Sequence, residues 1–267
     1  MCKSTYVDMK KLLFLLNIAS VILVLFVNYY SQTGAINDKT VGSLSIEYNN
    51  LFTPASFAFA IWGMIFLGLI LLAIFQGGTL FSRRRAFSSF DHMGFIFALV
   101  NLGNATWVIV WLYEFTFLSV LVMTGMLIGL LTILIRFSAN MATYSLLEKL
   151  FVLVPVNIYA GWIAVATIAN VAAFLSKLGW TGGVFSEVAW TIIMITIAVG
   201  ANIFVTWTKS VKAFSLVGIW ALYAIYARHE SSYESIAFAA LAGLIVLGVS
   251  TLAKVVSEQR ILQVQKA

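Results

Sequence analysis

The chain contains repeated stretches that carry almost no charge and are long enough to cross a lipid bilayer. The clearest one runs from residue 150 to residue 175 without a charged side chain. A helix rises about 1.5 Å per residue, so roughly 20 apolar residues span the hydrocarbon core. A soluble domain of this size would carry more charge than the 10% found here, against 62% hydrophobic residues. We therefore predict an all-α fold, a polytopic membrane helix bundle.

Eight such stretches can be read along the chain. They cover roughly residues 12–30, 54–76, 92–113, 117–135, 150–175, 187–208, 213–227 and 235–253. Seven is the alternative count, because the seventh stretch is short and follows the sixth closely. The first stretch lacks the small-residue cleavage site of a signal peptide, so we expect it to remain as a membrane helix.

The positive charges predict how these spans are oriented. With the N-terminus inside, eight spans leave only Lys39, Lys177 and Arg228 outside, so the other 13 of the 16 lysines and arginines lie inside. Lys and Arg accumulate on the cytoplasmic side, and we expect both termini in the cytoplasm and the chain in the plasma (inner) membrane. The triple arginine 83–85 is then a topology anchor at the lipid surface. The net charge of +6 thus points to the bilayer as a partner and not to nucleic acid.

Aromatic and amide side chains recur at steps of three and four in three of the spans, so each set shares one helical face. An amide or tryptophan stripe inside a membrane should face protein or a cavity and not lipid. The asparagines can bond neighbouring helices or line a pocket, and both readings stay open. The stripes are Ala55, Phe59, Trp62 and Phe66; Asn101, Asn104, Trp107 and Trp111; and Tyr159, Trp162, Ala166 and Asn170.

The sequence offers no catalytic constellation. His92 and His229 fall at opposite predicted faces of the membrane, and the single Cys2 cannot form an intrachain disulfide or a cysteine metal cluster. No carboxylate is predicted deep in a span, and no phosphate-binding loop is present. We expect no catalytic residue, no metal and no cofactor, and an enzyme is the less favoured class. A pocket of aromatic and amide groups suits a flat or bulky apolar ligand.

Three motifs resemble those of the TspO/MBR family, the tryptophan-rich sensory proteins and translocator proteins. The fifth span keeps the spacing Tyr-x-x-Trp-x-x-x-Ala-x-x-x-Asn from Tyr159 to Asn170, and the third span has Leu-x-Asn-x-x-Trp from Leu102 to Trp107. The second span begins Thr53-Pro54 and continues through Phe59 and Trp62. The sequence departs from the family pattern at Ile158, where the family has proline. The tryptophan and lysine-proline usual in the family's first loop are also absent.

The resemblance implies a five-helix unit over residues 1–178, with a ligand pocket closed by the first loop. The apolar stretches add three further helices and a short cytoplasmic tail over 179–267, which the resemblance does not cover. Family ligands are porphyrins and other tetrapyrroles, sterols and benzodiazepine-type compounds. Family roles include sensing, transport and porphyrin degradation. The ligand-binding residues carried over from the motifs and stripes are Phe59, Trp62, Asn104, Trp107, Trp111, Tyr159, Trp162 and Asn170.

Three functional hypotheses follow. The first is a membrane ligand-binding or sensory protein that holds a hydrophobic, tetrapyrrole- or sterol-like molecule. The second is a small-molecule transporter that uses all eight helices, and the third is a structural partner that docks through the last three. Gly125-x-x-x-Gly129 in the fourth span allows close helix approach, most simply within the bundle, with a homodimer as its less favoured use.

Overall fold

The computed structural model describes residues 2–48, 50–81 and 88–264, so the triple arginine 83–85 lies outside the described residues. The chain forms two compact units. Unit 1 contains Met1–Leu44 and Ile61–Tyr159, and unit 2 contains Ser45–Ala60 and Ala160–Ala267. The division falls inside the helix that carries Tyr159, Trp162 and Asn170.

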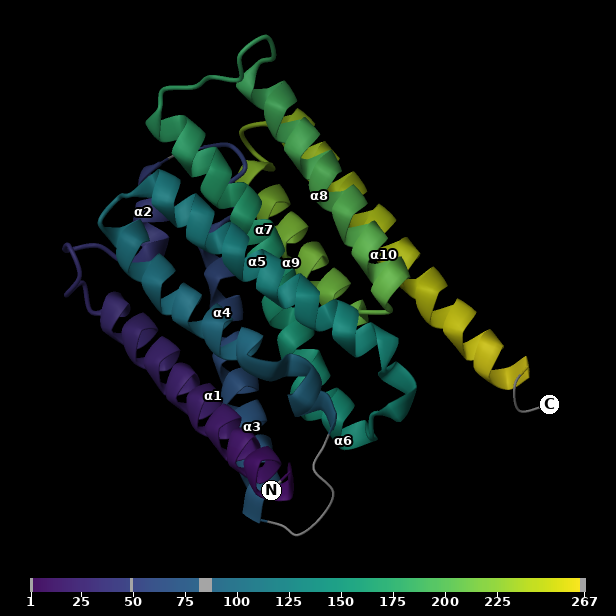
Figure 1. Cartoon of the computed structure of the whole chain (residues 1–267). Helices are drawn as coiled ribbons and strands as arrows, with labels where there is room; N and C mark the ends of the chain where they lie inside the picture. The colour runs from purple at the N-terminus through teal and green to yellow at the C-terminus, as the bar shows by residue number, and fades with distance from the viewer. Residues whose placement is uncertain (1, 49, 82–87, 265–267) are drawn as a thin grey trace. The chain divides into compact units, whose positions relative to one another are not determined.

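Unit 1 is built from four long helices and the irregular start of a fifth. The long helices are α1 (Cys2–Gln32), α3 (Ile61–Phe81), α4 (Ser88–Leu112) and α5 (Thr116–Ala139). Helix α4 packs against α1 and α5, and α1 also packs against α3 (Figure 1). Short elements follow: η2 (Met141–Thr143), α6 (Leu146–Glu148) and a π-helical turn η3 (Lys149–Leu153), which leads into α7 (Val154–Lys177).

Unit 2 contains the 3₁₀ turn η1 (Ser56–Ala60), most of α7, and the helices α8 (Glu187–Lys209), α9 (Lys212–His229) and α10 (Glu234–Val264). Helix α10 lies along both α8 and α9, and α9 packs against η1. The short helix α2 (Val41–Glu47) in the first loop spans the division between the units. The core of unit 2 includes the buried side chains of Phe52, Met194, Leu222, Ile225 and Ile236.

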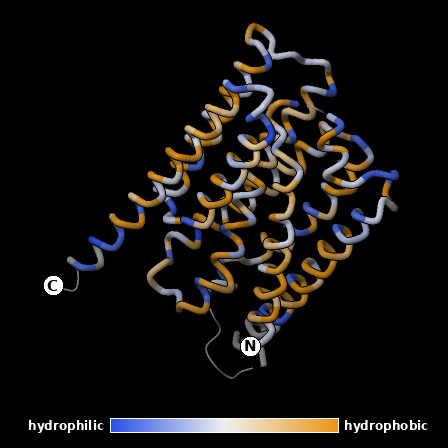
Figure 2. The backbone as a smooth tube through the Cα atoms, turned by 180° about the vertical axis from the view of Figure 1, so that it is seen from behind, coloured by the Kyte–Doolittle hydropathy of each residue, from blue (hydrophilic) through white to orange (hydrophobic). Residues whose placement is uncertain are grey.

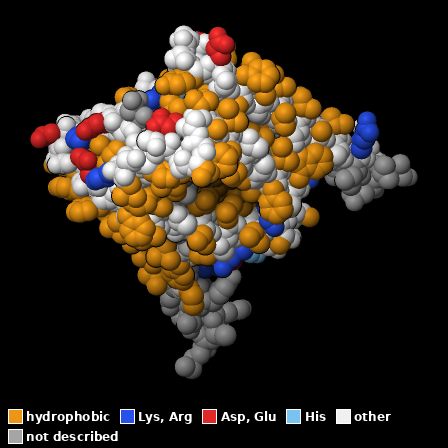
Figure 3. All heavy atoms as spheres, turned by 90° about the horizontal axis from the view of Figure 1, so that it is seen from above, with side chains coloured by type: hydrophobic (Ala, Val, Ile, Leu, Met, Phe, Trp, Pro, Cys, Tyr) orange, Lys and Arg blue, Asp and Glu red, His pale blue; other side chains and the backbone are white. Residues whose placement is uncertain are grey.

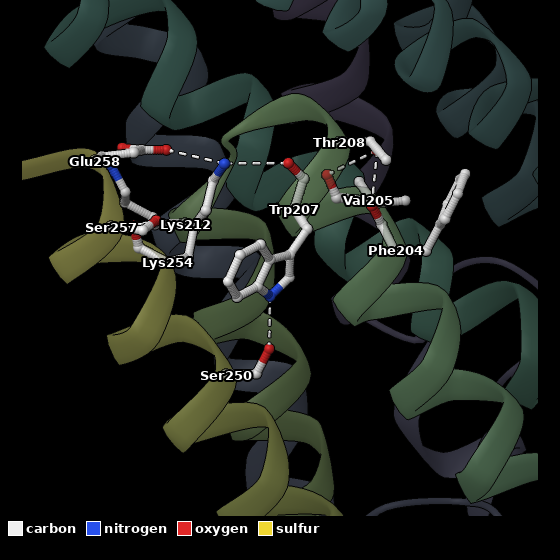
Figure 4. Close-up of polar contacts among 9 residues, drawn as sticks. All are labelled: Phe204, Val205, Trp207, Thr208, Lys212, Ser250, Lys254, Ser257 and Glu258. Carbon is white, nitrogen blue, oxygen red and sulfur yellow. Dashed lines mark hydrogen bonds and ion pairs between the residues drawn. The ribbon is translucent and has the colours of Figure 1, made fainter. Parts of the chain in front are cut away.

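A polar cluster ties the ends of the last three helices together (Figure 4). Glu258 of α10 pairs with Lys212 at the start of α9 and with Lys254, 3.4 Å away on its own helix. Lys254 Nζ donates a hydrogen bond to the Trp207 carbonyl (3.1 Å), and the Trp207 indole N–H donates to Ser250 Oγ (2.8 Å). Because Trp207 lies on α8, the cluster joins all three helices at the tight α8–α9 turn.

The described residues form eight helices of 18 residues or more, and the predicted all-α membrane bundle is confirmed. Seven candidate spans in the described part of the chain are long and apolar enough to cross a membrane. Helix α9 occupies the place of the predicted seventh span but is less apolar, because it begins at Lys212 and ends at Arg228 and His229. Hydrophobic residues run along the helices (Figure 2) and cover much of the face in Figure 3. The chain is an integral, multi-pass membrane protein.

Candidate functional site

Four of the predicted site residues form one aromatic cluster in unit 1, here called the indole cluster: Trp62, Trp107, Trp111 and Tyr159. The Trp62 ring stacks with Trp107 at a centroid distance of 6.5 Å, and Trp107 stacks with Trp111 at 6.0 Å. Tyr159 meets Trp62 edge to face at 6.3 Å. Trp107 and Trp111 are one helical turn apart, so α4 places both rings on the same face. Residues from the predicted stripes of the second, third and fifth spans therefore meet at this cluster: Trp62 from the second, Trp107 and Trp111 from the third, and Tyr159 from the fifth.

Asn104 is held at the indole cluster by an amide that the sequence analysis did not single out. Asn28 Nδ2 of α1 donates to Asn104 Oδ1 at 2.8 Å, and it also donates to the Val24 carbonyl at 2.8 Å. Both asparagines are buried. This bond fixes the Asn104 amide, because its oxygen must face α1 and its nitrogen must face the other way. The signal that could have identified Asn28 is the polar series Asn17, Ser20, Asn28 and Ser31 on one side of the first span.

Two polar atoms at this position, Asn104 Nδ2 and the Tyr159 hydroxyl oxygen, lack a well-formed hydrogen bond among the described residues. Asn104 interacts with the Tyr159 hydroxyl. Among the described residues, however, neither Asn104 Nδ2 nor the Tyr159 hydroxyl has a partner with complete hydrogen-bond geometry. Both residues are fully buried, and buried polar groups without partners are costly and rare in folded proteins. The indole cluster therefore combines apolar ring faces with a donor and a hydroxyl that can bond a further group.

The other three predicted site residues lie in unit 2. Phe59 meets the Trp162 ring edge to face, with centroids 6.0 Å apart. Asn170 is buried on α7, about two turns beyond Trp162. The predicted set is thus divided, with Trp62, Asn104, Trp107, Trp111 and Tyr159 in unit 1 and Phe59, Trp162 and Asn170 in unit 2.

The first loop is anchored in unit 1 at the end of α4. Lys39 Nζ pairs with Glu114 Oε1 at 2.8 Å, and the Trp111 indole N–H donates to the Val41 carbonyl at 3.3 Å. Trp111 therefore has two roles in this unit. Its ring closes the indole cluster, and its polar edge holds the loop.

The following loop segment, which the structure describes at residues 48 and 50–58, is held in unit 2 through its main-chain carbonyls. Four side chains donate to these carbonyls: Ser176 to Tyr48 (2.7 Å), Arg228 to Thr53 (2.7 Å), His229 to Leu51 (2.8 Å) and Trp220 to Ala58 (3.1 Å). Burial lowers the pKa of the Arg228 guanidinium. Burial also lowers the pKa of His229 and outweighs its hydrogen bond to Leu51. Three of the four donors lie on α9, so an additional C-terminal helix positions the loop.

Unit 2 also contains a cavity of about 60 Å³, which the sequence analysis did not predict. It lies between Asn50 and Leu51 of the first loop, the C-terminal part of α7, and the start of α8. Trp180 and Trp190 line it and meet edge to face at 4.8 Å. The sequence pattern alone does not distinguish indoles that line a cavity from indoles that lie at the membrane interface.

The histidines and the carboxylates of the described residues form no metal-binding group of three or more. Tyr144 Oη and His92 Nδ1 share a hydrogen bond of 2.8 Å, and burial followed by the Glu148 charge raises the pKa of Tyr144 to about 12. Glu148 accepts hydrogen bonds from the Ser89 amide (3.1 Å) and the Ser145 amide (2.9 Å). These contacts join the start of α4 to the turn before α7.

The helices define the class: a helical membrane protein that buries a cluster of aromatic and amide side chains. A family model described as TSPO-like protein matches residues 14–253. Because the match covers most of the chain, the chain belongs to the TSPO-like family, and the resemblance seen in its motifs is confirmed. Comparison with curated proteins and with solved structures gives no match. The matched range includes most of α8 to α10, so it extends beyond the five-helix unit expected to end at residue 178.

Proposed function

We propose that this protein binds a flat, hydrophobic small molecule, tetrapyrrole- or sterol-like, at the indole cluster inside the membrane. The contiguous stack of Trp62, Trp107 and Trp111 against Tyr159 carries the proposal. Indole faces bind flat apolar ligands, and an edge-to-face or stacked aromatic pair contributes about 0.5–1.5 kcal/mol beyond the area it buries. Asn104 and Tyr159 would supply the polar contact that orients the ligand. Phe59, Trp162 and Asn170 remain ligand contacts predicted from the sequence, and they lie in unit 2.

Titration of the purified protein with protoporphyrin, followed by the porphyrin absorbance, tests this proposal. Saturable binding is expected, and the double variant Trp62→Ala/Trp107→Ala should bind at least about tenfold more weakly, a change of about 1.4 kcal/mol. Trp207→Ala is the matched control, because this exposed tryptophan lies outside the indole cluster. Equal affinity in the double variant and the control would exclude the indole cluster as the binding site.

A further inference from the structure

The cavity of unit 2 is separate from the indole cluster in its residues and in its chemistry. Its walls include the apolar side chains of Leu51, Ala172 and Met194, together with Asn50 and Trp190. At about 60 Å³ it has room for a carbonyl group and the carbons next to it, while the rest of a small ligand extends beyond the cavity. It is therefore too small for a tetrapyrrole or a sterol ring system, and it suits a compact ligand or the end group of a longer one.

Two hydrogen-bond donors of the lining residues have no partner in the described part of the chain. They are Asn50 Nδ2 and Trp190 Nε1, and both atoms are buried. Asn50 Oδ1 accepts from the Phe52 amide (3.1 Å) and the Thr53 amide (3.0 Å), so the turn fixes the orientation of this side chain. The unpaired group at Asn50 is thus its N–H₂ group. An indole nitrogen can only donate, so the unmet requirement at Trp190 is also for an acceptor.

The hydroxyls around the cavity are already used as donors, and the charge of its lining excludes an anion. Ser176 Oγ donates to the Tyr48 carbonyl at 2.7 Å, and Thr191 Oγ1 donates to the Glu187 carbonyl at 2.8 Å. Glu187 is the one charged residue among the described lining residues. A carboxylate or phosphate would be repelled by Glu187 and would find no lysine or arginine among these residues. A neutral acceptor meets no such penalty.

We propose that this cavity is a binding site for a compact neutral carbonyl group, which accepts hydrogen bonds from Asn50 and Trp190 while its apolar substituents contact Leu51 and Met194. The carbonyl can belong to a small free molecule, such as a ketone or an amide, or to the ester linkage of a membrane lipid. His229 fixes the Leu51 carbonyl and Arg228 the Thr53 carbonyl. The additional helix α9 therefore holds the loop side of this site.

The test uses the full-length protein in lipid nanodiscs, with ¹⁵N-labelled tryptophan, and follows the indole N–H signals by NMR. The probes are cyclopentanone and methylenecyclopentane, which have the same ring and differ in the carbonyl oxygen. Cyclopentanone should shift the Trp190 N–H signal saturably, and methylenecyclopentane should not. The signal is assigned by its loss in Trp190→Phe, which keeps an aromatic ring and removes the donor.

Matched variants show whether the N–H groups of Asn50 and Trp190 are responsible for cyclopentanone binding. Trp190→Phe should weaken cyclopentanone binding about two- to tenfold, the effect of losing one neutral hydrogen bond. Asn50→Asp should weaken it as well, because the carboxylate still accepts from the turn amides but has no N–H to donate. Trp207→Phe is the control, since it makes the same substitution in an indole that does not line the cavity. It should leave the affinity ratio of the two probes unchanged.

Comparison of nanodiscs made of ester-linked and ether-linked phosphatidylcholine distinguishes the two sources of the carbonyl. A Trp190 signal that differs between these lipids before any probe is added identifies the lipid ester as the occupant. The same signal in both lipids, with a shift on adding cyclopentanone, identifies a free molecule. A Trp190 signal that responds to neither lipid nor probe would overturn the proposal. Equal binding of the two probes would do so as well, as would equal effects of Trp207→Phe and Trp190→Phe on cyclopentanone affinity.

Discussion

Asn28 and Asn104 form a buried hydrogen bond, so the effect of replacing one asparagine on stability depends on whether the other is present. Removing one amide leaves the other unsatisfied in an apolar interior, which costs about 1–3 kcal/mol. We therefore expect Asn28→Leu to lower the unfolding free energy by this amount. In the double variant Asn28→Leu/Asn104→Leu much of the loss should be recovered, because no amide remains unpaired. Unfolding in detergent, followed by circular dichroism, measures both.

A second hydrogen bond between α1 and α4 provides the control for this coupling. Asn101 Nδ2 donates to Ser20 Oγ at 3.1 Å, so Ser20→Ala breaks a separate α1–α4 bond. Its effect should add to that of Asn28→Leu, whereas the Asn28 and Asn104 effects should not add to each other. Additive losses from Asn28→Leu and Asn104→Leu would show that this pair is not coupled.

His229 should make stability depend on pH. Burial lowers its pKa below the ordinary value of 6.5, so the unfolded chain takes up a proton more readily than the folded one. The folded protein should lose stability as the pH falls from about 6.5 toward this lowered pKa, and the effect should be absent above 6.5. His229→Gln removes the titrating ring, so its thermal midpoint should fall less between pH 7 and pH 5. If the thermal midpoint of His229→Gln falls with pH as steeply as that of the unaltered protein, His229 is not the group that causes the pH dependence.

At the residue scale, the sequence predicts what one helix face contains but not what it meets. Trp107 and Trp111 could be placed on one face because helical spacing requires it. The partner of Asn104 could not be predicted, since Asn28 is 76 residues away. Nor could the contact of His229 with Leu51, across 178 residues, because only tertiary packing brings these groups together.

The two glycines of the Gly-x-x-x-Gly motif in α5 differ in their surroundings. A Cβ at Gly129 would lie 2.7 Å from Val100 Cγ2 of α4, whereas a Cβ at Gly125 would meet nothing within 4 Å. Gly129→Ala should therefore lower stability by up to about 2 kcal/mol, after overpacking is offset by the better helix propensity of alanine. Gly125→Ala should be neutral or stabilising by up to about 1 kcal/mol.

Thermal unfolding of the two variants in one detergent compares them directly, and a cross-linking assay reports whether either changes the oligomeric state. A larger loss for Gly125→Ala, together with loss of a dimer, would assign the motif to a homodimer and not to the bundle.

At the element scale, hydropathy located the spans and missed their irregular backbone. The predicted third span is interrupted at Gly94, which has φ 56° and ψ −154°, and Arg136 donates to the nearby His92 carbonyl at 3.4 Å. The predicted fifth span begins with the π-helical turn Lys149–Leu153, which leads directly into α7 and its Pro155. A proline ring clashes with the carbonyl four residues earlier, and a wider turn relieves this clash. An average over about 20 residues cannot detect either feature.

At the scale of the whole molecule, the additional helices contribute to the surroundings of the first loop. The sequence predicted a five-helix unit ending at residue 178, and that boundary remains a prediction. In the structure, however, loop residues 45–60 belong to the same compact unit as α8, α9 and α10. Arg228 and His229 bond this loop segment directly. Substitutions in α9 are therefore expected to change the affinity for any ligand that the loop covers, even though α9 itself does not contact that ligand.

The orientation of the loops in the membrane separates eight spans from seven, and labelling of single thiols can measure it. Cys2 is the single cysteine, so Cys2→Ser provides a background in which one new thiol can be placed at a time. Ala142, Thr181 and Ser231 are exposed residues outside the long helices and suit such substitution. Under the eight-span orientation, Thr181→Cys and Ser231→Cys face outside and Ala142→Cys faces the cytoplasm.

A membrane-impermeant maleimide, added to intact cells, should therefore label the thiols at 181 and 231, and should label the one at 142 only after lysis. The discriminating position is Ser231, which follows α9. If α9 does not cross the membrane, residue 231 stays on the same side as the α8–α9 turn and is protected in intact cells. Labelling at 181 without labelling at 231 would thus replace eight spans by seven. Because a thiol reacts as its thiolate, and burial in apolar surroundings disfavours that form, exposed loop positions give the clearest contrast.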